Sequence, residues 1–524
     1  MTRHSFALAA SLVLAVAPVA SAQTFGTDDP TLRRIWTLGM DSSRLEPLAQ
    51  VLLDSIGPRL TGSPGMESAS RWVVAQYRSW GIPARTERYG TWRGWRRGAS
   101  HIDLLQPRVR SLEGTLLAWS PGTNGRDVDA PAIVLPDAAD SAAFAAWLPS
   151  VRGKYVLVSA PQASCRSDDN WEEFARPESY ERHRDARAAA QREWSRRRER
   201  TGLGARELQR RLEGAGARGV VTSLWTGGWG VTRVFNGRTE RIPVVELSCE
   251  DYGLVYRLAE KGQGPVLRVN AEAQSLGEVP VFNTIAEIRG SEKPDEYVVL
   301  SAHFDSWDGA SGATDNGTGT VTMMEAMRIL KSVYPNPRRT ILVGHWSGEE
   351  QGLNGSRAFA KDHPEVVAGL QVLLNQDDGT GRIRNISMQG LTNAGGSFTR
   401  WLAQMPSELT EELNLSFPGL ASGGGSDHAS FACAGAPAFM LGSLSWDYGT
   451  YTWHTNRDTY DKLVFDDLRR NAIFVAMLAY LASEDPERVP RDRRAVMPVD
   501  DGGRPREWPV CRDADRSSAV SPRM

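Results

Sequence analysis

The sequence contains little cysteine for its length: four residues among 524, at positions 165, 249, 433 and 511. Four cysteines in so long a chain do not make a disulfide-scaffold protein, and no two have the CxxC spacing of a thiolate zinc site. Three pairings are possible, and the sequence does not choose among them. A charge excess is also missing. The net charge is −2 with 24% charged residues, which argues against nucleic-acid binding and against a disordered chain.

Long apolar runs are missing after the N-terminal segment. A basic start at Arg3 precedes an apolar run from Phe6 to Val19, and Ala20-Ser21-Ala22 matches the small-x-small pattern of signal cleavage sites. The run is too short to favour a membrane span. We therefore expect a signal peptide at 1–22, a mature chain from Gln23, a secreted or periplasmic location, and no stable membrane insertion after cleavage.

The length of the chain predicts at least two domains, because the ~500 residues after the signal peptide are more than one hydrophobic core usually holds. Short apolar strands between turns fill 111–275, whereas longer strands alternate with helices elsewhere. We predict one domain from 30–110 and 276–486, an α/β insert at 111–275, and an irregular tail at 487–524. The Arg-dense stretch 171–213 has interspersed acids, which favours a solvated helix over a polyanion-binding one.

Apolar patterning after the insert predicts the fold class. Strands are expected at 297–302, 340–346, 370–376 and 437–441, and helices at 317–333, 354–361 and 466–482. Strands that alternate with helices imply an α/β fold with a mainly parallel central sheet and helices on both faces. Open sheets of this kind place their sites just beyond the carboxyl ends of the strands.

Candidate metal ligands occur at these strand ends. They are His303, Asp305 and Asp315 in AHFDSWDGASGATDNGTG, Glu349 and Glu350 in WSGEEQGLNGS, Asp377 and Asp378 in LLNQDDGT, and His454 in YTWHTNRDTYDKL. Each motif alone is weak, but together they offer a ligand set for two zinc ions that share one carboxylate. Asp315 suits the shared position because Gly312 and Gly317 allow a tight bend around it. The adjacent Glu349 and Glu350 point in different directions, so one can ligate while the other acts as general base.

These segments resemble the co-catalytic zinc exopeptidase family, strongly over 282–485 and loosely over 30–110. HFDSW followed by Asp308 is most similar to its plasma glutamate carboxypeptidase branch. The insert resembles the protease-associated (PA) domain found in that family. The resemblance therefore implies a zinc exopeptidase fold with a smaller PA-like insert.

The resemblance also implies roles for individual residues. One zinc ion would be bound by His303, Asp315 and Asp377, and the other by Asp315, Glu350 and His454. Glu349 would be the general base and Asp305 the residue that orients His303. Asp378 is the alternative to Asp377.

We expect a secreted di-zinc exopeptidase that acts on peptides. An aminopeptidase is the first choice, because the carboxylates of the site suit an α-ammonium group. Arg357 and Arg457 lie near the motifs, so a dipeptidase or carboxypeptidase of the plasma glutamate carboxypeptidase type is the alternative. An N-acyl amino acid amidohydrolase and a single-zinc glutaminyl cyclase type stay open, whereas the filled ligand positions disfavour a non-catalytic protein. No nucleic-acid partner is expected, and the sequence does not indicate an oligomeric state.

Weaker candidates lie around the predicted site. Asp427 and His428 in GGGSDHASF face either the substrate or a capped turn. Candidates for the wall of a specificity pocket are Trp446, Asp447 and Tyr448. His345 lies inside a strand and is expected to be packed. We expect the insert to restrict access to the site without supplying ligands.

Overall fold

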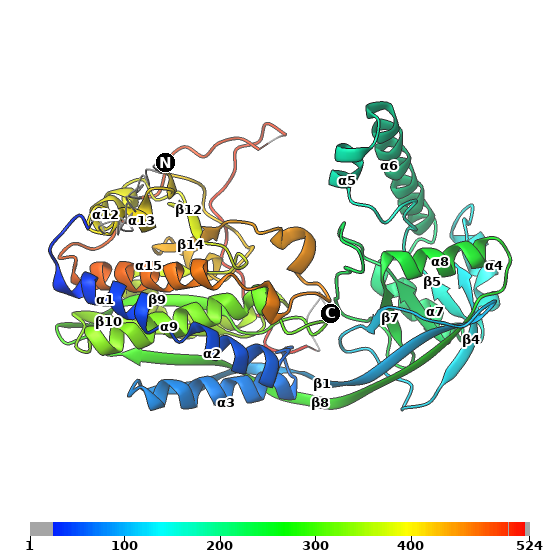
Figure 1. Ribbon diagram of the computed structural model, residues 1–524, viewed down its shortest axis with the longest axis horizontal. Helices are drawn as coiled ribbons and strands as arrows, with labels where there is room; N and C mark the ends of the chain where they lie inside the picture. The colour runs from blue at the N-terminus through cyan, green and yellow to red at the C-terminus, as the bar shows by residue number, and fades with distance from the viewer. Residues whose placement is uncertain (1–24, 501, 519–524) are drawn as a thin grey trace, which may run out of the picture.

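The computed structural model describes residues 25–500 and 502–518 as two lobes joined by a pair of long strands (Figure 1). The predicted signal peptide lies outside the described residues. Within them, no helix combines the length and the apolar character needed to cross a membrane.

Four parallel strands form the centre of the first lobe, in the order β14 (Ala438–Ser443), β11 (Leu370–Asn375), β9 (Lys293–His303) and β10 (Arg339–Trp346). Antiparallel strands extend this sheet on both sides: β8 (Val266–Ile288) and β1 (Ala84–Gln106) beyond β10, and β12 (Ile383–Ser387) beyond β14. A short strand, β13 (Asn414–Ser416), runs parallel to β12 at the edge. The predicted α/β fold with a mainly parallel central sheet is confirmed.

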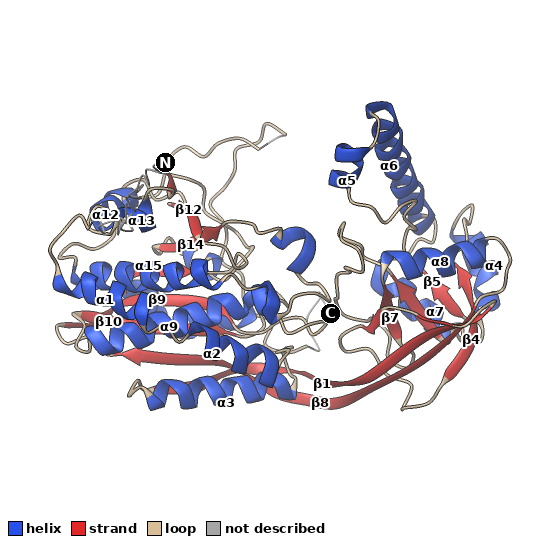
Figure 2. Cartoon of the chain, in the orientation of Figure 1, coloured by secondary structure: helices blue, strands red, loops and turns tan. Residues whose placement is uncertain are grey.

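Helices cover both faces of this sheet (Figure 2). The helices of this lobe are α1 (Pro30–Asp41), α2 (Leu45–Gln50), η1 (Val51–Ile56), α3 (Pro64–Ser79), η3 (Ala313–Gly317), α9 (Thr318–Val333), α10 (Asn354–Asp362), α11 (Pro364–Gly369), α12 (Ala394–Leu402), α13 (Ser407–Thr410), α14 (Ala429–Ala432), η4 (Tyr448–Thr452), η5 (Tyr460–Lys462) and α15 (Phe465–Glu484). Successive side chains of a strand point to opposite faces. Val298 and Leu300 of β9 therefore join a core with α1, α9 and α15, whereas Val299 joins another with α10, α11 and α14. Burial on both faces explains why these strands are apolar without alternation.

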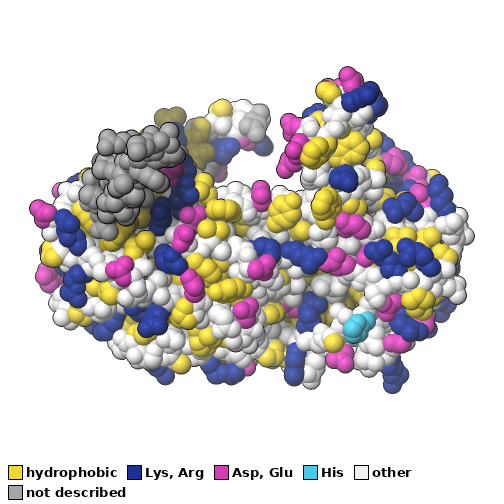
Figure 3. Space-filling model, viewed as in Figure 1, with side chains coloured by type: hydrophobic (Ala, Val, Ile, Leu, Met, Phe, Trp, Pro, Cys, Tyr) yellow, Lys and Arg dark blue, Asp and Glu magenta, His cyan; other side chains and the backbone are white. Residues whose placement is uncertain are grey.

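The second lobe is a smaller α/β unit. Its strands are β2 (Arg110–Ser111), β3 (Gly114–Leu116), β4 (Val128–Val134), β5 (Tyr155–Leu157), β6 (Gly219–Thr222) and β7 (Val244–Leu247), and its helices are α4 (Ser141–Trp147), η2 (Leu148–Val151), α5 (Asp168–Phe174), α6 (Pro177–Glu199), α7 (Ala205–Gly214) and α8 (Cys249–Glu260). β4, β5, β6 and β7 are parallel neighbours over their own hydrophobic core. Helix α6 projects from this lobe, and its visible face mixes acidic, basic and apolar side chains (Figures 1 and 3).

The lobes are connected through β1 and β8 rather than by a flexible linker. Each strand has 23 residues, and they pair from Ala84 with Ala286 to Gln106 with Val266. Ile102 of β1 already packs in the core of the second lobe. A register irregularity follows Gly94, so the ribbon changes course between the lobes.

The tail after 486 is irregular in its described residues and lies along the first lobe through isolated bridges and one disulfide. That disulfide joins Cys433 to Cys511, and a second joins Cys165 to Cys249 within the second lobe. The structure thus selects one of the three pairings that the sequence left open.

Candidate metal centre

The first donor group consists of His303, Asp315 and Asp377. His303 ends β9, and Asp377 lies two residues beyond β11. Asp315 lies within η3, in the connection from β9 to α9, where its own backbone is not helical. The Nε2 atom of His303 is 3.1 Å from Oδ1 of Asp315 and 3.1 Å from Oδ1 of Asp377. Its Nδ1 atom donates to the carbonyl oxygen of Asp305 at 2.9 Å. That bond directs the lone pair of Nε2 toward the two carboxylates.

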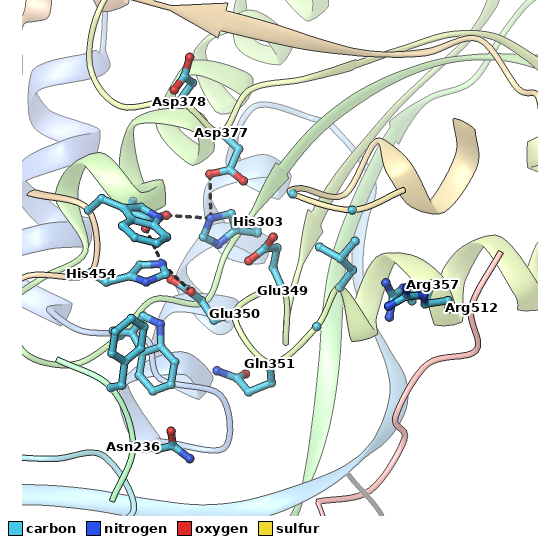
Figure 4. Close-up of a pocket in the computed structure, with 18 of the residues that line it drawn as sticks. Asn236, His303, Glu349, Glu350, Gln351, Arg357, Asp377, Asp378, His454 and Arg512 are labelled. Carbon is cyan, nitrogen blue, oxygen red and sulfur yellow. Dashed lines mark hydrogen bonds and ion pairs between the residues drawn. The ribbon is translucent and has the colours of Figure 1, made fainter. Parts of the chain in front are cut away.

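The second donor group consists of Asp315, Glu350 and His454. Nε2 of His454 is 2.9 Å from Oε2 of Glu350 and 3.1 Å from Oδ2 of Asp315 (Figure 4). Asp315 therefore directs one carboxylate oxygen toward each group, which is the arrangement of a bridging ligand. The donor atoms of each group lie within 4.8 Å of one another.

Strand topology explains why distant motifs meet here. β9, β10 and β11 are parallel neighbours, so their carboxyl ends share one edge of the sheet. In the β9/β10 ladder, His303 pairs in register with Trp346, three residues before Glu349. The predicted strand-end positions thus come together at a single edge.

The atoms of both groups fit a cation. Oε1 of Glu350 is a buried acceptor with no hydrogen-bond donor in the described structure, and Oδ2 of Asp315 is buried with only Nε2 of His454 close to it. Burial lowers the pKa of His454, but the carboxylates of Glu350 and Asp315 outweigh it and raise this pKa to about 10. The carboxylates of Glu350 and Asp315 therefore favour a positive charge beside His454. Imidazole and carboxylate donors at these positions suit zinc.

Residues 283–479 match the family model of peptidase family M28. Carboxypeptidase Q of Pongo abelii is 25% identical over 442 residues, which cover 84% of this chain and 85% of that protein. Among solved structures, a peptidase M28 precursor from Shewanella amazonensis SB2B has a TM-score of 0.65 and 23% identity, with 90% of this chain and all of that chain covered. BSAP, a zinc aminopeptidase from Bacillus subtilis, has a TM-score of 0.55 and 18% identity, with 86% and 96% covered.

The chain is thus similar to peptidase family M28 over residues 283–479. This confirms the family resemblance of the sequence motifs, and the donor chemistry agrees with it. The protein is a zinc-dependent metallopeptidase.

Asp305 contacts His303 through its backbone carbonyl oxygen, and its carboxylate makes other bonds. That carboxylate lies 3.9 Å from Nδ1 of His303. It instead accepts the backbone N–H groups of Glu349 at 3.1 Å and Glu350 at 3.3 Å, and the hydroxyl of Thr61 at 3.1 Å. The backbone carbonyl of Asp305 is the group within hydrogen-bond distance of Nδ1 of His303. Asp305 therefore fixes the turn that carries both glutamates.

Glu349 and Glu350 point in different directions from that turn. Glu350 reaches His454, whereas Glu349 lies beside the first donor group without a bond to it in Figure 4. Burial raises the pKa of Glu349 well above its usual range, and the nearby carboxylates of Asp377 and Asp427 raise it further. Glu349 therefore lies next to the donor atoms without belonging to either donor group.

Two buried residues that the sequence did not reveal support the Asp315 loop. Arg59 donates to the carbonyl oxygens of Phe304 at 2.8 Å, Ser311 at 2.7 Å and Gly312 at 2.8 Å. Asp458 accepts the N–H groups of Thr314 at 2.7 Å and Asp315 at 3.0 Å.

Arg59 and Asp458 both lie close to sequence motifs of the predicted site. Arg59 stands in the turn-rich GPRLTGSPG loop, and Asp458 follows His454 by four residues. Neither spacing by itself indicates contact with the metal-binding loop.

A cavity of about 810 Å³ opens over the donor atoms between the lobes. The second lobe contributes Trp119, Phe235 and Arg238, among others, to its lining. The first lobe contributes Arg357, and the tail contributes Arg512. The peptidase site is therefore built from three parts of the chain.

The remaining candidates divide as follows. Tyr448 lines the cavity, but Trp446 and Asp447 do not. Asp427 and His428 are buried and do not line it; the neighbouring glycines 423–425 do.

Three further candidates have partners of their own. Asp378 lines the cavity but accepts the N–H of Ser443 at 2.7 Å and joins neither donor group. His345 bonds to the hydroxyl of Tyr77 at 2.8 Å, as expected for a packed residue. Arg457 pairs with Glu113 and lies outside the cavity lining.

Proposed function

We propose that the protein is a secreted di-zinc exopeptidase. The observation that carries the proposal is the position of Asp315, whose two carboxylate oxygens face different donor groups. His303, Asp315 and Asp377 would hold one zinc ion, and Asp315, Glu350 and His454 the other. Bound zinc would lower the pKa of water and polarise a peptide carbonyl.

Glu349 is the proposed general base. Its carboxylate accepts a proton from the attacking water as the new C–O bond forms. It then delivers that proton to the amine nitrogen as the C–N bond breaks. The two N–H bonds from the glutamate turn to Asp305 keep Glu349 and Glu350 in their separate orientations.

An aminopeptidase is the first proposal for polarity. The carboxylates of the cavity include Glu349 and the metal-ligand candidate Asp377, and they suit the α-ammonium group of a substrate held close to the scissile bond.

A dipeptidase is the second candidate, because Arg357 and Arg512 line the same cavity. Figure 4 shows both arginines on the side away from His454. Guanidinium groups there suit the free carboxylate of a short peptide. Similarity to carboxypeptidase Q over 84% of the chain is compatible with either polarity.

A panel of three peptides tests the proposal. An aminopeptidase cleaves Leu-Ala and Leu-Ala-amide but not N-acetyl-Leu-Ala. A dipeptidase cleaves only Leu-Ala. Cleavage of N-acetyl-Leu-Ala with loss of the amide would refute the N-terminal choice, and activity on N-acyl amino acids alone would favour an amidohydrolase.

The proposed extracellular location is supported by the two disulfides, because such bonds persist in oxidising compartments. We further propose that the second lobe is the PA-like insert that limits access to the cavity.

A further inference from the structure

His454 is held in an unfavourable backbone conformation. Its φ of +57° lies in the left-handed region, which residues other than glycine rarely adopt. Its loop lies between η4 and η5, outside the central sheet. His303, by contrast, ends a buried strand. Something other than the sheet must therefore fix His454.

The imidazole of His454 also lacks the anchor that His303 has. Nδ1 of His303 donates to a backbone carbonyl, whereas the buried Nδ1 of His454 has no hydrogen-bond partner in the described part of the chain. A histidine ligand is usually oriented through its second nitrogen. Here packing and the backbone must supply the orientation.

The second lobe supplies backbone contacts to this loop through residues 230–234. The N–H of Val234 donates to the carbonyl oxygen of His454 at 2.7 Å. The side chain of Asn456 accepts the N–H of Thr232 at 3.0 Å and donates to the carbonyl oxygen of Gly230 at 2.9 Å. These bonds hold the carbonyl group of the strained residue and the side chain two residues after it.

Aromatic rings from both lobes pack around the imidazole. Phe235 of the second lobe meets the His454 ring edge-on, with centroids 5.2 Å apart. Trp453 stacks on the same ring at 4.1 Å, and the guanidinium of Arg233 lies 4.3 Å from the centroid of Trp453. We call residues 230–235 the junction segment.

A buried carboxyl group anchors the junction segment inside the second lobe. Glu246 of β7 accepts the hydroxyl of Thr232, the hydroxyl of Thr222 and the N–H of Leu224. A continuous chain of bonds thus runs from β7 through Thr232 and Asn456 to the loop of His454.

We propose that the junction segment positions His454, so that the second lobe completes the second donor group without supplying a ligand. The inference rests on the proposed role of His454 as a zinc ligand. Thr232, Asn456 and Glu246 are then positioning residues. Because coupling is reciprocal, zinc in the second donor group should also hold the junction segment in place.

The test compares zinc affinities by chelator competition and hydrogen exchange with and without zinc. Asn456→Ala and Thr232→Val should weaken one of the two zinc ions by roughly 10–100-fold and leave the other unchanged. Thr222→Val is the matched control, because it removes a hydroxyl bond to the same Glu246 but leaves the bond between Glu246 and Thr232 of the junction segment in place. In the unaltered protein, zinc should slow exchange of the Val234 amide. The retained zinc ion reports that the variants are folded.

Three results would overturn the inference: wild-type affinity for both ions in Asn456→Ala and Thr232→Val, equal weakening of both ions, or Val234 exchange that is indifferent to zinc. His454→Ala tests the ligand role of His454 separately from its positioning by the junction segment. Loss of one ion supports the ligand role of His454, whereas retention of both refutes that role itself.

Discussion

The backbone carbonyl of Asp305 lies 2.9 Å from Nδ1 of His303, whereas the carboxylate of the same residue lies 3.9 Å away. One residue therefore supports two parts of the site. Its carbonyl fixes the imidazole of His303, and its carboxylate fixes the turn that carries Glu349 and Glu350.

Asp305→Asn should lower kcat about 10-fold while both zinc ions stay bound. The carbonyl contact with His303 survives, but an amide replaces one acceptor of the glutamate turn, which costs about 1–2 kcal/mol. Steady-state kinetics with metal analysis measures both effects. Thr61→Val removes only the third bond and should have a smaller effect. Loss of zinc with unchanged kcat would contradict this division of roles.

Glu349→Gln should retain both zinc ions and the fold while kcat falls ~10²–10⁴-fold. That loss corresponds to about 3–5 kcal/mol of transition-state stabilisation. Glu350→Gln is the matched variant at the adjacent position and should instead weaken one metal ion. The roles would be reversed if Glu349→Gln lost zinc and Glu350→Gln kept it.

Arg357→Gln and Arg512→Gln decide between the two polarities. For a dipeptidase, each should raise KM for Leu-Ala severalfold, because a charge-assisted bond to the terminal carboxylate contributes on the order of 1–2 kcal/mol. For an aminopeptidase, KM for Leu-Ala and Leu-Ala-amide should change alike. Arg457→Gln is the control, since Arg457 pairs with Glu113 outside the cavity lining.

Glu246 should make stability depend on pH. Burial raises its pKa from 4.5 to about 7. The folded state therefore binds this proton more tightly than the unfolded state, so the free energy of unfolding falls as pH rises between these two values. The whole effect is on the order of 3 kcal/mol.

Glu246→Gln removes this titration. Its Tm relative to the wild type should rise by a few degrees between about pH 5 and about pH 8. Glu240→Gln, at an exposed position of the same lobe, should show no such trend. A Tm difference for Glu246→Gln that stays constant over this range would contradict the assignment.

Local patterns predicted the first-lobe sheet well. The strand expected at 340–346 is β10 at Arg339–Trp346, and the helix expected at 466–482 is α15 at Phe465–Glu484. Burial on both faces leaves a continuous apolar run, which is visible in sequence. The clustering of the candidate ligands could also be predicted, because the carboxyl ends of neighbouring parallel strands lie at the same edge of the sheet.

Long-range pairings could not be predicted in the same way. The ribbon of β1 and β8 joins segments more than 150 residues apart, and no local pattern marks their register. Arg59 donates to carbonyl oxygens before Asp315, and Val234 donates to the carbonyl oxygen of His454. Every residue has a backbone carbonyl, so the sequence does not indicate which one accepts such a bond. For Asp305, the side-chain direction after a turn decided which oxygen faced His303.

Metal analysis of the purified, gently dialysed protein tests the central claim most directly. With Asp315 bridging two donor groups, elemental analysis should give two zinc ions per chain, and His454→Ala should reduce the value to one. A reproducible value near one zinc ion in the unaltered protein would contradict the two-metal centre, and a value near zero would refute the metal assignment altogether.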